Sequence, residues 1–292
     1  MSRTPLLRFR VPVRFAQAPQ GRFLGNELRS AFGWALRRLS CLTAAPSCQG
    51  CPIRRRCAYG VVFDPEAPSA PLHPSLRDGI PAYVVEPPPY GPSATPDSAI
   101  FALTLLPPAV PYASAIERAL RRAWVDNPRL LGGCRANGPL ERETLPPAAE
   151  SADEDTGERL VLEFDTPLRV EQHGTVVADA NRLRPADLAR LLVRRLQQWD
   201  QLSGERLSPL ATDPALWQAI TIETRGLFPI DLHRYSRSQG RSHPLGGLIG
   251  PLEVRGPRAN LRALLPLLRH AEPLHLGKRT AFGLGRFHLR WG

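Results

Sequence analysis

The 292-residue sequence predicts an α+β protein made of two tandem ferredoxin-like (RRM-like) domains with a C-terminal glycine-rich loop. Three observations support this prediction. The order strand–helix–strand–strand–helix–strand occurs twice, an acidic segment without large apolar side chains separates the two copies, and 42% of the residues are hydrophobic, enough for a core. We place the N-terminal domain at 1–145, the linker at 146–158 and the C-terminal domain at 159–292.

The first copy begins with a strand and an amphipathic helix. Apolar and basic residues alternate from Leu6 to Phe15, as in a strand with one buried face. Leucine and phenylalanine then recur at helical spacing from Leu24 to Leu39. The remaining elements of this copy are strands at 83–85 and 100–106, a helix at 116–124 and a strand near Leu140.

The second copy repeats the same order more clearly. A strand is predicted at 160–164, and Pro185 opens a helix whose apolar stripe runs from Leu188 to Trp199. Strands follow at 219–230 and 245–254, then a leucine-rich helix at 260–270 and a closing strand at 287–291. Pro266 lies inside that last helix and is expected to kink or restart it.

The charge balance points to a polyanionic partner. There are 38 Lys and Arg against 27 Asp and Glu, a net charge of +11, and a balance this basic most often marks a nucleic-acid-binding protein. Lys278 is the only lysine, so nearly all the positive charge is guanidinium, which binds phosphates bidentately and stacks on bases. No apolar run approaches the ~20 residues that cross a bilayer, and residues 1–5 lack signal-peptide features. We therefore expect a cytoplasmic protein without membrane contact.

The segment 276–286 is a glycine-rich, basic loop. Its glycines let the backbone approach a ligand, its cations attract phosphate, and its phenylalanine offers a ring for base stacking. A P-loop needs Gly-x4-Gly-Lys-Ser/Thr before a helix, whereas a strand follows here. The segment therefore predicts RNA binding, with a tight turn of incidental charge as the alternative. The RNA-binding candidates in it are Gly277, Lys278, Arg279, Phe282, Gly283, Gly285 and Arg286.

Residues 276–285, Leu-Gly-Lys-Arg-Thr-Ala-Phe-Gly-Leu-Gly, resemble the glycine-rich loop of the CRISPR precursor-RNA-processing endoribonucleases of the repeat-associated mysterious protein (RAMP) superfamily. Residues 233–237 and 245–250 are similar to the C-terminal domain of that family, and residues 28–33 with the cysteines that follow resemble the start of a subset of it. The resemblance implies tandem ferredoxin-like domains and binding of a CRISPR repeat RNA, often as a hairpin. It also implies cleavage without a catalytic metal.

A cysteine cluster forms an insertion in the first domain at 41–57. Cys41, Cys48, Cys51 and Cys57 follow a C-x6-C-x2-C-x5-C spacing, and thiolates around a C-x2-C core suit tetrahedral zinc. Four thiolates leave no open coordination position, so the zinc would be structural. An iron–sulfur cluster, which also uses four thiolates, and unligated cysteines are the alternatives. Cys134 is isolated and is expected to be a small buried residue.

Metal-free RNA cleavage by the 2′-hydroxyl needs a base, an acid and a cation that stabilises the phosphorane. Many members of the family carry a histidine near the first helix, but the first histidine here is His73, so that position is unfilled. His233 and Tyr235 are the leading catalytic candidates, because alternate residues of an extended segment share a face. His243 lies nearby in sequence.

Two other interpretations of these residues stay open. The segment around His233 would only bind RNA if Arg234, Arg237 and Arg241 act as a solvated basic surface. Catalysis would instead depend on the first helix if Arg29 and Arg38 position the phosphate there, although an arginine is a poor base.

The predicted function is an endoribonuclease that cleaves CRISPR precursor RNA within its repeats and retains the guide RNA. The products would carry a 2′,3′-cyclic phosphate and a 5′-hydroxyl. The rival prediction is a non-catalytic RAMP-type RNA-binding subunit, whose partners would include other subunits of a CRISPR effector complex.

Overall fold

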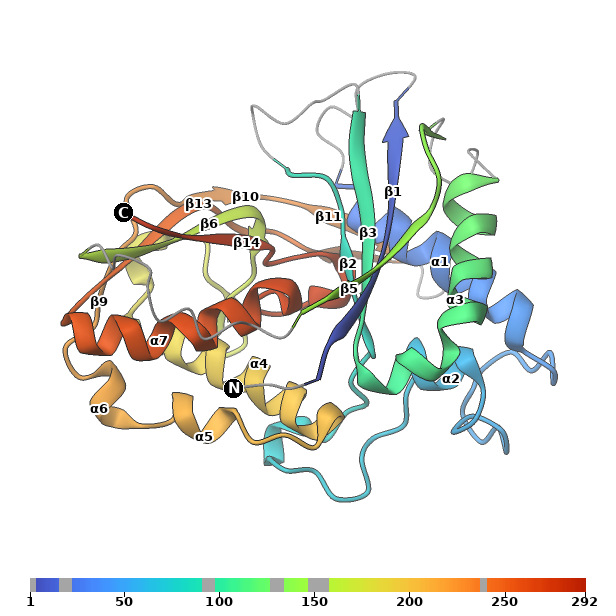
Figure 1. Cartoon of the computed structure of the whole chain (residues 1–292), viewed down its shortest axis with the longest axis horizontal. Coiled ribbons are helices and arrows are strands. Elements are labelled where there is room, and N and C mark those ends of the chain that lie inside the picture. The colour runs from blue at the N-terminus through green and yellow to red at the C-terminus, as the bar shows by residue number, and fades with distance from the viewer. Residues whose placement is uncertain (1–3, 16–22, 91–97, 127–133, 147–157, 237–240) are drawn as a thin grey trace.

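The computed structural model describes residues 4–15, 23–90, 98–126, 134–146, 158–236 and 241–292. The chain forms two units, each with a five-stranded antiparallel sheet and its long helices packed beside it (Figure 1). The predicted linker lies almost wholly outside the described residues. Among the described residues, no helix has the length and apolar character needed to cross a membrane.

The N-terminal sheet has the order β2-β3-β1, with β4 and β5 both paired to the other edge of β1. With β1 as first strand, this is the ferredoxin-like order that the sequence predicts. Its strands are β1 (Leu6–Arg14), β2 (Tyr83–Glu86), β3 (Ser98–Leu105), β4 (Arg135–Ala136) and β5 (Glu141–Leu145). Its helices are α1 (Gly25–Ser40), α2 (Ala58–Val62) and α3 (Ala113–Leu120), which a π turn, η3 (Arg121–Val125), extends.

The C-terminal sheet repeats this topology, with the order β10-β13-β6-β14 and β9 also paired to β13. Its strands are β6 (Arg159–Leu168), β9 (Thr221–Glu223), β10 (Phe228–Ile230), β13 (Gly247–Arg255) and β14 (Phe287–Trp291). Its helices are α4 (Pro185–Ser203), α5 (Ser208–Ala211), α6 (Pro214–Trp217) and α7 (Arg258–Ala271). Two hairpins stand outside the sheets: β7 (Glu171–Gln172) with β8 (Thr175–Val176), and β11 (His233–Ser236) with β12 (Arg241–Pro244).

Short 3-10 turns connect several of these elements. They are η1 (Pro74–Leu76), η2 (Pro107–Tyr112), η5 (Ala180–Arg182), η6 (Glu272–Leu274) and η7 (Thr280–Phe282).

Local sequence explains where the long helices begin and end. Pro185 occupies the first turn of α4, the Asp187 carboxylate accepts the Arg184 N–H at 2.8 Å, and Gly204 ends the helix in the left-handed region. In α1, Glu27 lies in the first turn and Arg37 in the last, so both charges complement the helix dipole.

One sequence prediction about an element is wrong. The segment 219–230 is two short strands, because Gly250 (φ +110°) bulges β13 and the turn at Gly226 packs against Pro251. Helix α7 continues through Pro266, so of the two expected outcomes the restart does not occur. The carbonyl that loses its helical partner belongs to Arg262, an exposed residue, while the leucine stripe around it stays buried.

The two units share one continuous apolar core. The buried cluster runs from Leu6 and Phe9 of β1 to Phe164 of β6 and Phe287 of β14. Cys134 is 2% exposed, as the sequence predicts for an isolated cysteine. The domains are therefore packed as one body, and a site at their junction has fixed walls.

Candidate nucleic-acid interface

The glycine-rich loop, residues 276–286, is fixed by backbone hydrogen bonds to the C-terminal domain. The Leu276 N–H donates to the Gly285 carbonyl at 2.9 Å and closes the loop on itself. The Lys278 N–H donates to the Arg169 carbonyl at 3.0 Å, and the Gly285 N–H donates to the Pro167 carbonyl at 3.0 Å. The loop therefore has a defined conformation before any ligand binds.

The same loop also contacts the N-terminal domain. Gly283 (φ +85°) lies so close to the end of β2 that a Cβ there would be 2.4 Å from Pro87 Cδ. The Arg286 guanidinium donates to the Pro87 carbonyl at 2.7 Å. The glycines permit close approach, as the sequence suggests, but in this structure the backbone approaches the other domain.

Phe282 holds the loop against α1. The guanidinium of Arg29 lies 4.2 Å from the centre of the Phe282 ring and 4.3 Å from that of Phe63. We call this arrangement the Phe63–Arg29–Phe282 stack. Because Phe282 is only 7% exposed and faces Arg29, the ring packs in the protein and does not offer an open face to a base.

Part of the loop's positive charge is neutralised within the protein. Lys278 forms an ion pair with Glu171, and Arg286 lies 3.0 Å from an Asp165 oxygen. Arg279 adopts a left-handed backbone conformation (φ +67°) at the start of η7. Lys278 and Arg286 are therefore held in place by carboxylates.

The β11–β12 hairpin packs on the loop through three buried leucines. Leu232 precedes β11, Leu245 follows β12, and both contact Leu284 of the loop. The buried Arg169 adds a second link, because its guanidinium donates to the Gly246 carbonyl at 3.2 Å and its own carbonyl accepts from Lys278. The structure thus brings together the three C-terminal segments that carry the family resemblance.

The two histidines of the hairpin do not lie on one face. His233 pairs with Pro244 in the register, and His243 pairs with Arg234, so the two histidines occupy opposite faces of the ribbon. Tyr235 belongs to the same strand, two residues from His233, and pairs with Ser242 in the register. Arg237 lies outside the described residues.

His233 has a carboxylate partner. Its side chain is 56% exposed, and its Nε2 lies 3.0 Å from an Asp231 oxygen. The Asp231 carboxylate therefore holds the His233 imidazole at the start of β11.

The two candidate arginines of α1, Arg29 and Arg38, lie on different faces of the helix. Arg29 takes part in the stack with the loop, whereas Arg38 lies 5.1 Å from the ring of Trp34 on the outer side of the helix. The two do not form one site. Arg29 is therefore better placed to position the loop than to act on a phosphate with Arg38.

The four cysteines line one small pocket together with Tyr59. Cys41 ends α1 and Cys57 caps the start of α2, so the segment joins these two helices. The described residues include no set of three or more His, Cys, Asp or Glu side chains already placed to hold a metal ion. The four thiols line the same pocket, but they are not arranged as a metal-coordination sphere.

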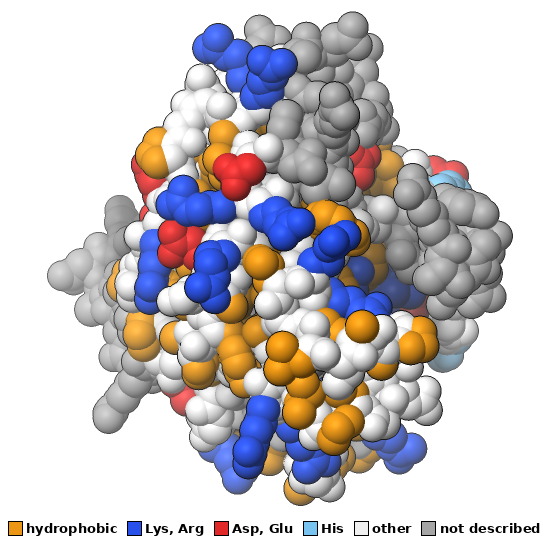
Figure 2. All heavy atoms as spheres, turned by 90° about the vertical axis from the view of Figure 1, so that its right-hand side faces the viewer, with side chains coloured by type: hydrophobic (Ala, Val, Ile, Leu, Met, Phe, Trp, Pro, Cys, Tyr) orange, Lys and Arg blue, Asp and Glu red, His pale blue; other side chains and the backbone are white. Residues whose placement is uncertain are grey.

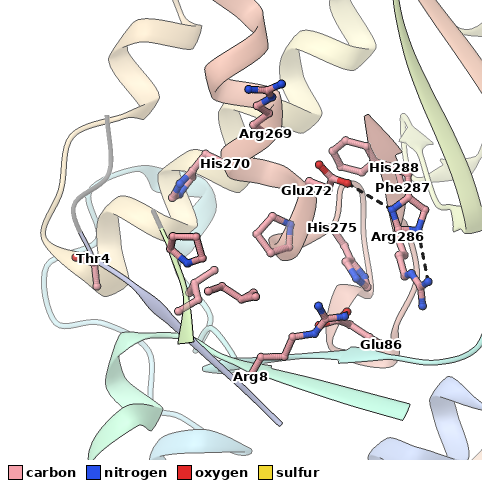
Figure 3. Close-up of a pocket in the computed structure, with 14 residues that line it drawn as sticks. Thr4, Arg8, Glu86, Arg269, His270, Glu272, His275, Arg286, Phe287 and His288 are labelled. Atoms are coloured by element: carbon pink, nitrogen blue, oxygen red, sulfur yellow. Dashed lines mark hydrogen bonds and ion pairs between the residues drawn. The ribbon is translucent and has the colours of Figure 1, made fainter. Parts of the chain in front are cut away.

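A pocket of about 280 Å³ lies where the two domains meet, next to the end of the glycine-rich loop (Figure 3). The N-terminal domain contributes Arg8 and Glu86, and the C-terminal domain contributes Glu272, His275 and His288. His275 is 1% exposed and packs in the interior.

His288 is the centre of an ion-pair cluster. Its Nε2 lies 3.2 Å from an Asp165 oxygen and its Nδ1 3.4 Å from a Glu272 oxygen. Figure 3 shows the ring between Glu272 and Arg286. Hydrogen bonds to Asp165 and then to Glu272 raise the pKa of His288 to about 9. Arg286 precedes β14 and His288 is its second residue, so the two lie two positions apart in the sequence.

Comparison with known families agrees with this geometry. Residues 162–287 match the family model described as CRISPR-associated endoribonuclease Cas6, and residues 4–144 match one described as an N-terminal domain. This match agrees with the predicted resemblance over residues 162–287, while the cysteine-containing subset stays a prediction. No curated protein sequence matches the chain.

Solved structures share the fold along the whole chain. A Cas6 product complex is 16% identical with a TM-score of 0.55, covering 98% of this chain and 100% of the other. A Thermus thermophilus Cas6 is 14% identical with a TM-score of 0.53, covering 99% and 100%. A protein described as a RAMP protein binding different RNA substrates is 13% identical with a TM-score of 0.50, covering 97% and 99%. These likenesses confirm the tandem ferredoxin-like fold.

Substituting Arg29 by methionine tests the Phe63–Arg29–Phe282 stack. Methionine keeps the length and apolar contact but removes the cation, so we expect the free energy of unfolding to fall by about 1–2 kcal/mol, the range of a partly desolvated cation–π contact. Urea unfolding followed by circular dichroism measures the change. Arg225→Met is the matched control, because Arg225 is 88% exposed. Equal stability of the two variants would contradict the stack.

The pKa of His288 predicts how stability depends on pH. Between about pH 6.5, where the unfolded histidine titrates, and about pH 9, the folded protein holds a proton that the unfolded chain has released. The free energy of unfolding should therefore fall as pH rises through this window. The effect is modest, because the side chain is 59% exposed.

Urea unfolding at a series of pH values from 6 to 9.5 measures this component. His288→Gln should flatten the slope, while His73→Gln, a change of an exposed histidine in another part of the chain, should retain it. A slope that is unchanged in His288→Gln would show that the cluster does not set the proton uptake.

Proposed function

We propose, from the premise that residues 162–287 are a domain of the CRISPR-associated endoribonuclease Cas6 family, that this chain cleaves CRISPR precursor RNA within its repeats and retains the guide RNA. The observation that carries the proposal is the assembly of the glycine-rich loop, the β11–β12 hairpin and α1 at one junction between the domains. The net charge of +11 favours an RNA ligand there.

The proposed chemistry is attack of the 2′-oxygen on the adjacent phosphorus. The bond from phosphorus to the 5′-oxygen breaks, which leaves a 2′,3′-cyclic phosphate and a 5′-hydroxyl. His233, oriented by Asp231, takes the proton of the 2′-hydroxyl, and Tyr235, two residues along the same strand, gives a proton to the 5′-oxygen. His243, on the other face, contacts RNA without sharing that step.

The loop and its neighbours supply the electrostatic part of the site. Lys278, Arg279 and Arg286 place positive charge beside the hairpin, and Arg234 and Arg241 belong to the paired strands themselves. Cations fixed before the substrate binds stabilise the developing phosphorane charge without reorganising. Arg29 acts through the loop that it positions.

A non-catalytic RNA-binding subunit is the second candidate. It is favoured by the absence of any histidine before His73, since many family members use a histidine near the first helix. In that case the hairpin would only hold RNA, and other effector subunits would supply any cleavage.

Incubation of the protein with its cognate repeat RNA in EDTA separates the two candidates. We expect cleavage with a 2′,3′-cyclic phosphate end, and a loss of roughly 100-fold or more in the single-turnover rate for His233→Asn, as for removal of a general base. His73→Asn is the matched control and should cleave at the wild-type rate. Tight binding without any cleavage would establish the non-catalytic candidate. Loss of cleavage on chelation would instead indicate a catalytic metal.

We also propose that the four cysteines bind a structural zinc ion. The four thiols line one pocket between the end of α1 and the start of α2. Within the segment, the Cys51 N–H donates to the Cys48 carbonyl at 3.2 Å, and this turn brings Cys48 and Cys51 close together. Four thiolates satisfy tetrahedral zinc and leave no position for a substrate.

Elemental analysis of protein purified without added metal tests this proposal. We expect about one zinc per chain, and a large decrease in Cys51→Ser because a ligand is lost. Cys134→Ser is the control, since Cys134 lies outside the segment and is buried elsewhere in the fold. Zinc well below one equivalent would contradict the proposal, and iron with visible absorbance would indicate an iron–sulfur cluster instead.

A further inference from the structure

The outer face of α1 carries an exposed tryptophan that does not pack in the hydrophobic core. Trp34 is 41% exposed, whereas Trp124 and Trp199 are among the largest fully buried side chains. Ser30, Trp34 and Arg38 recur at four-residue spacing along α1, so they form one stripe on the helix. This stripe is separate from the face on which Arg29 meets the glycine-rich loop.

Two guanidinium groups from different elements lie against this tryptophan. The Arg38 guanidinium is 5.1 Å from the ring centre, and that of Arg122 on η3 is 5.5 Å from it. Exposed Arg118 and Arg121 lie on the same α3–η3 segment, where Glu117 pairs with Arg121 at 3.2 Å. We call Trp34, Arg38 and Arg122 the Trp34 patch.

The charge of the Trp34 patch is not neutralised locally. Within the described part of the chain, neither Arg38 nor Arg122 has a carboxylate within ion-pair distance, unlike Lys278 and Arg286 of the glycine-rich loop. Figure 2 shows the side of the molecule with α1 and α3, where basic side chains gather over the middle of the face. Uncompensated guanidinium groups around an exposed indole attract a polyanion that can also stack.

We propose that the Trp34 patch is a second RNA-contacting surface, which binds unpaired nucleotides flanking the RNA that the glycine-rich loop holds. Unstacked bases pack on an indole ring or a guanidinium plane, while neighbouring phosphates pair with arginine. Bases inside an A-form duplex are stacked on one another and do not reach such a surface. The ligand is therefore single-stranded RNA.

The position of the patch allows one RNA to reach both surfaces. Arg29 and Trp34 are five residues apart on α1, which is about 7.5 Å along a helix axis. The patch lies around the helix from the stack, so a flank that leaves the loop surface can continue over the outer side of α1. This inference rests on the proposed function only in requiring that the loop binds RNA.

The test compares two RNAs by fluorescence anisotropy on the full chain. One is the repeat hairpin alone, and the other carries in addition a ten-nucleotide single-stranded flank, placed on one side or the other. For the wild-type protein the flank should improve the dissociation constant about tenfold, as expected for one or two stacked bases. Trp34→Ala should remove this improvement and leave the affinity for the bare hairpin unchanged.

Arg122→Gln should reduce the gain from the flank and its salt dependence by about one phosphate contact. Arg225→Gln, which changes an exposed arginine of the C-terminal domain, should alter neither. An equal effect of Trp34→Ala on both RNAs, or no effect on either, would overturn the inference.

Failure of the proposed function gives a different result. A protein that binds both RNAs without cleaving them contradicts only the proposed cleavage, whereas a protein that binds neither RNA contradicts RNA binding at the glycine-rich loop itself. If Trp34→Ala leaves RNA binding intact but disrupts association with a purified effector subunit, the patch is a protein-docking surface and the inference is wrong.

Discussion

The backbone of the glycine-rich loop lies closer to both domains than a side chain would allow. A Cβ at Gly285 would be 1.7 Å from the Leu276 carbonyl oxygen, and one at Gly283 would be 2.4 Å from Pro87. Both glycines also have positive φ, which side chains disfavour. The loop can therefore close on itself and touch the N-terminal domain only because these positions are glycine, and the arrangement of the site follows from that contact.

With the loop seated in this way, segments distant in sequence meet. Arg29 from α1 reaches Phe282, and the hairpin leucines reach Leu284. Arg169, at the end of β6, connects the Gly246 turn to the loop through its guanidinium and its carbonyl. Each of these contacts joins a different element to the loop, so the interface is rigid and preorganised for a ligand.

The basic side chains at the surface fall into two groups, those that are ion-paired within the protein and those that are not. Lys278 pairs with Glu171 and Arg286 pairs with Asp165, so these cations help to hold the junction between the domains together. The guanidinium groups around Trp34 have no such partner among the described residues and remain available to a polyanion. The same composition, rich in arginine, thus supplies both a fixed site and an open one.

The sequence by itself determined the fold. Period-two and helical apolar patterns are local, so the strand of residues 6–15, the α4 stripe and the repeated element order could be predicted, and the loop motif identified the family of the C-terminal domain. Only the tertiary structure decided what each side chain does there. Phe282 faces Arg29 instead of a base, His233 and His243 take opposite faces of a ribbon, and His288 gathers two carboxylates. These outcomes depend on register and on contacts between residues more than a hundred positions apart, and spacing along the chain carries no information about such contacts.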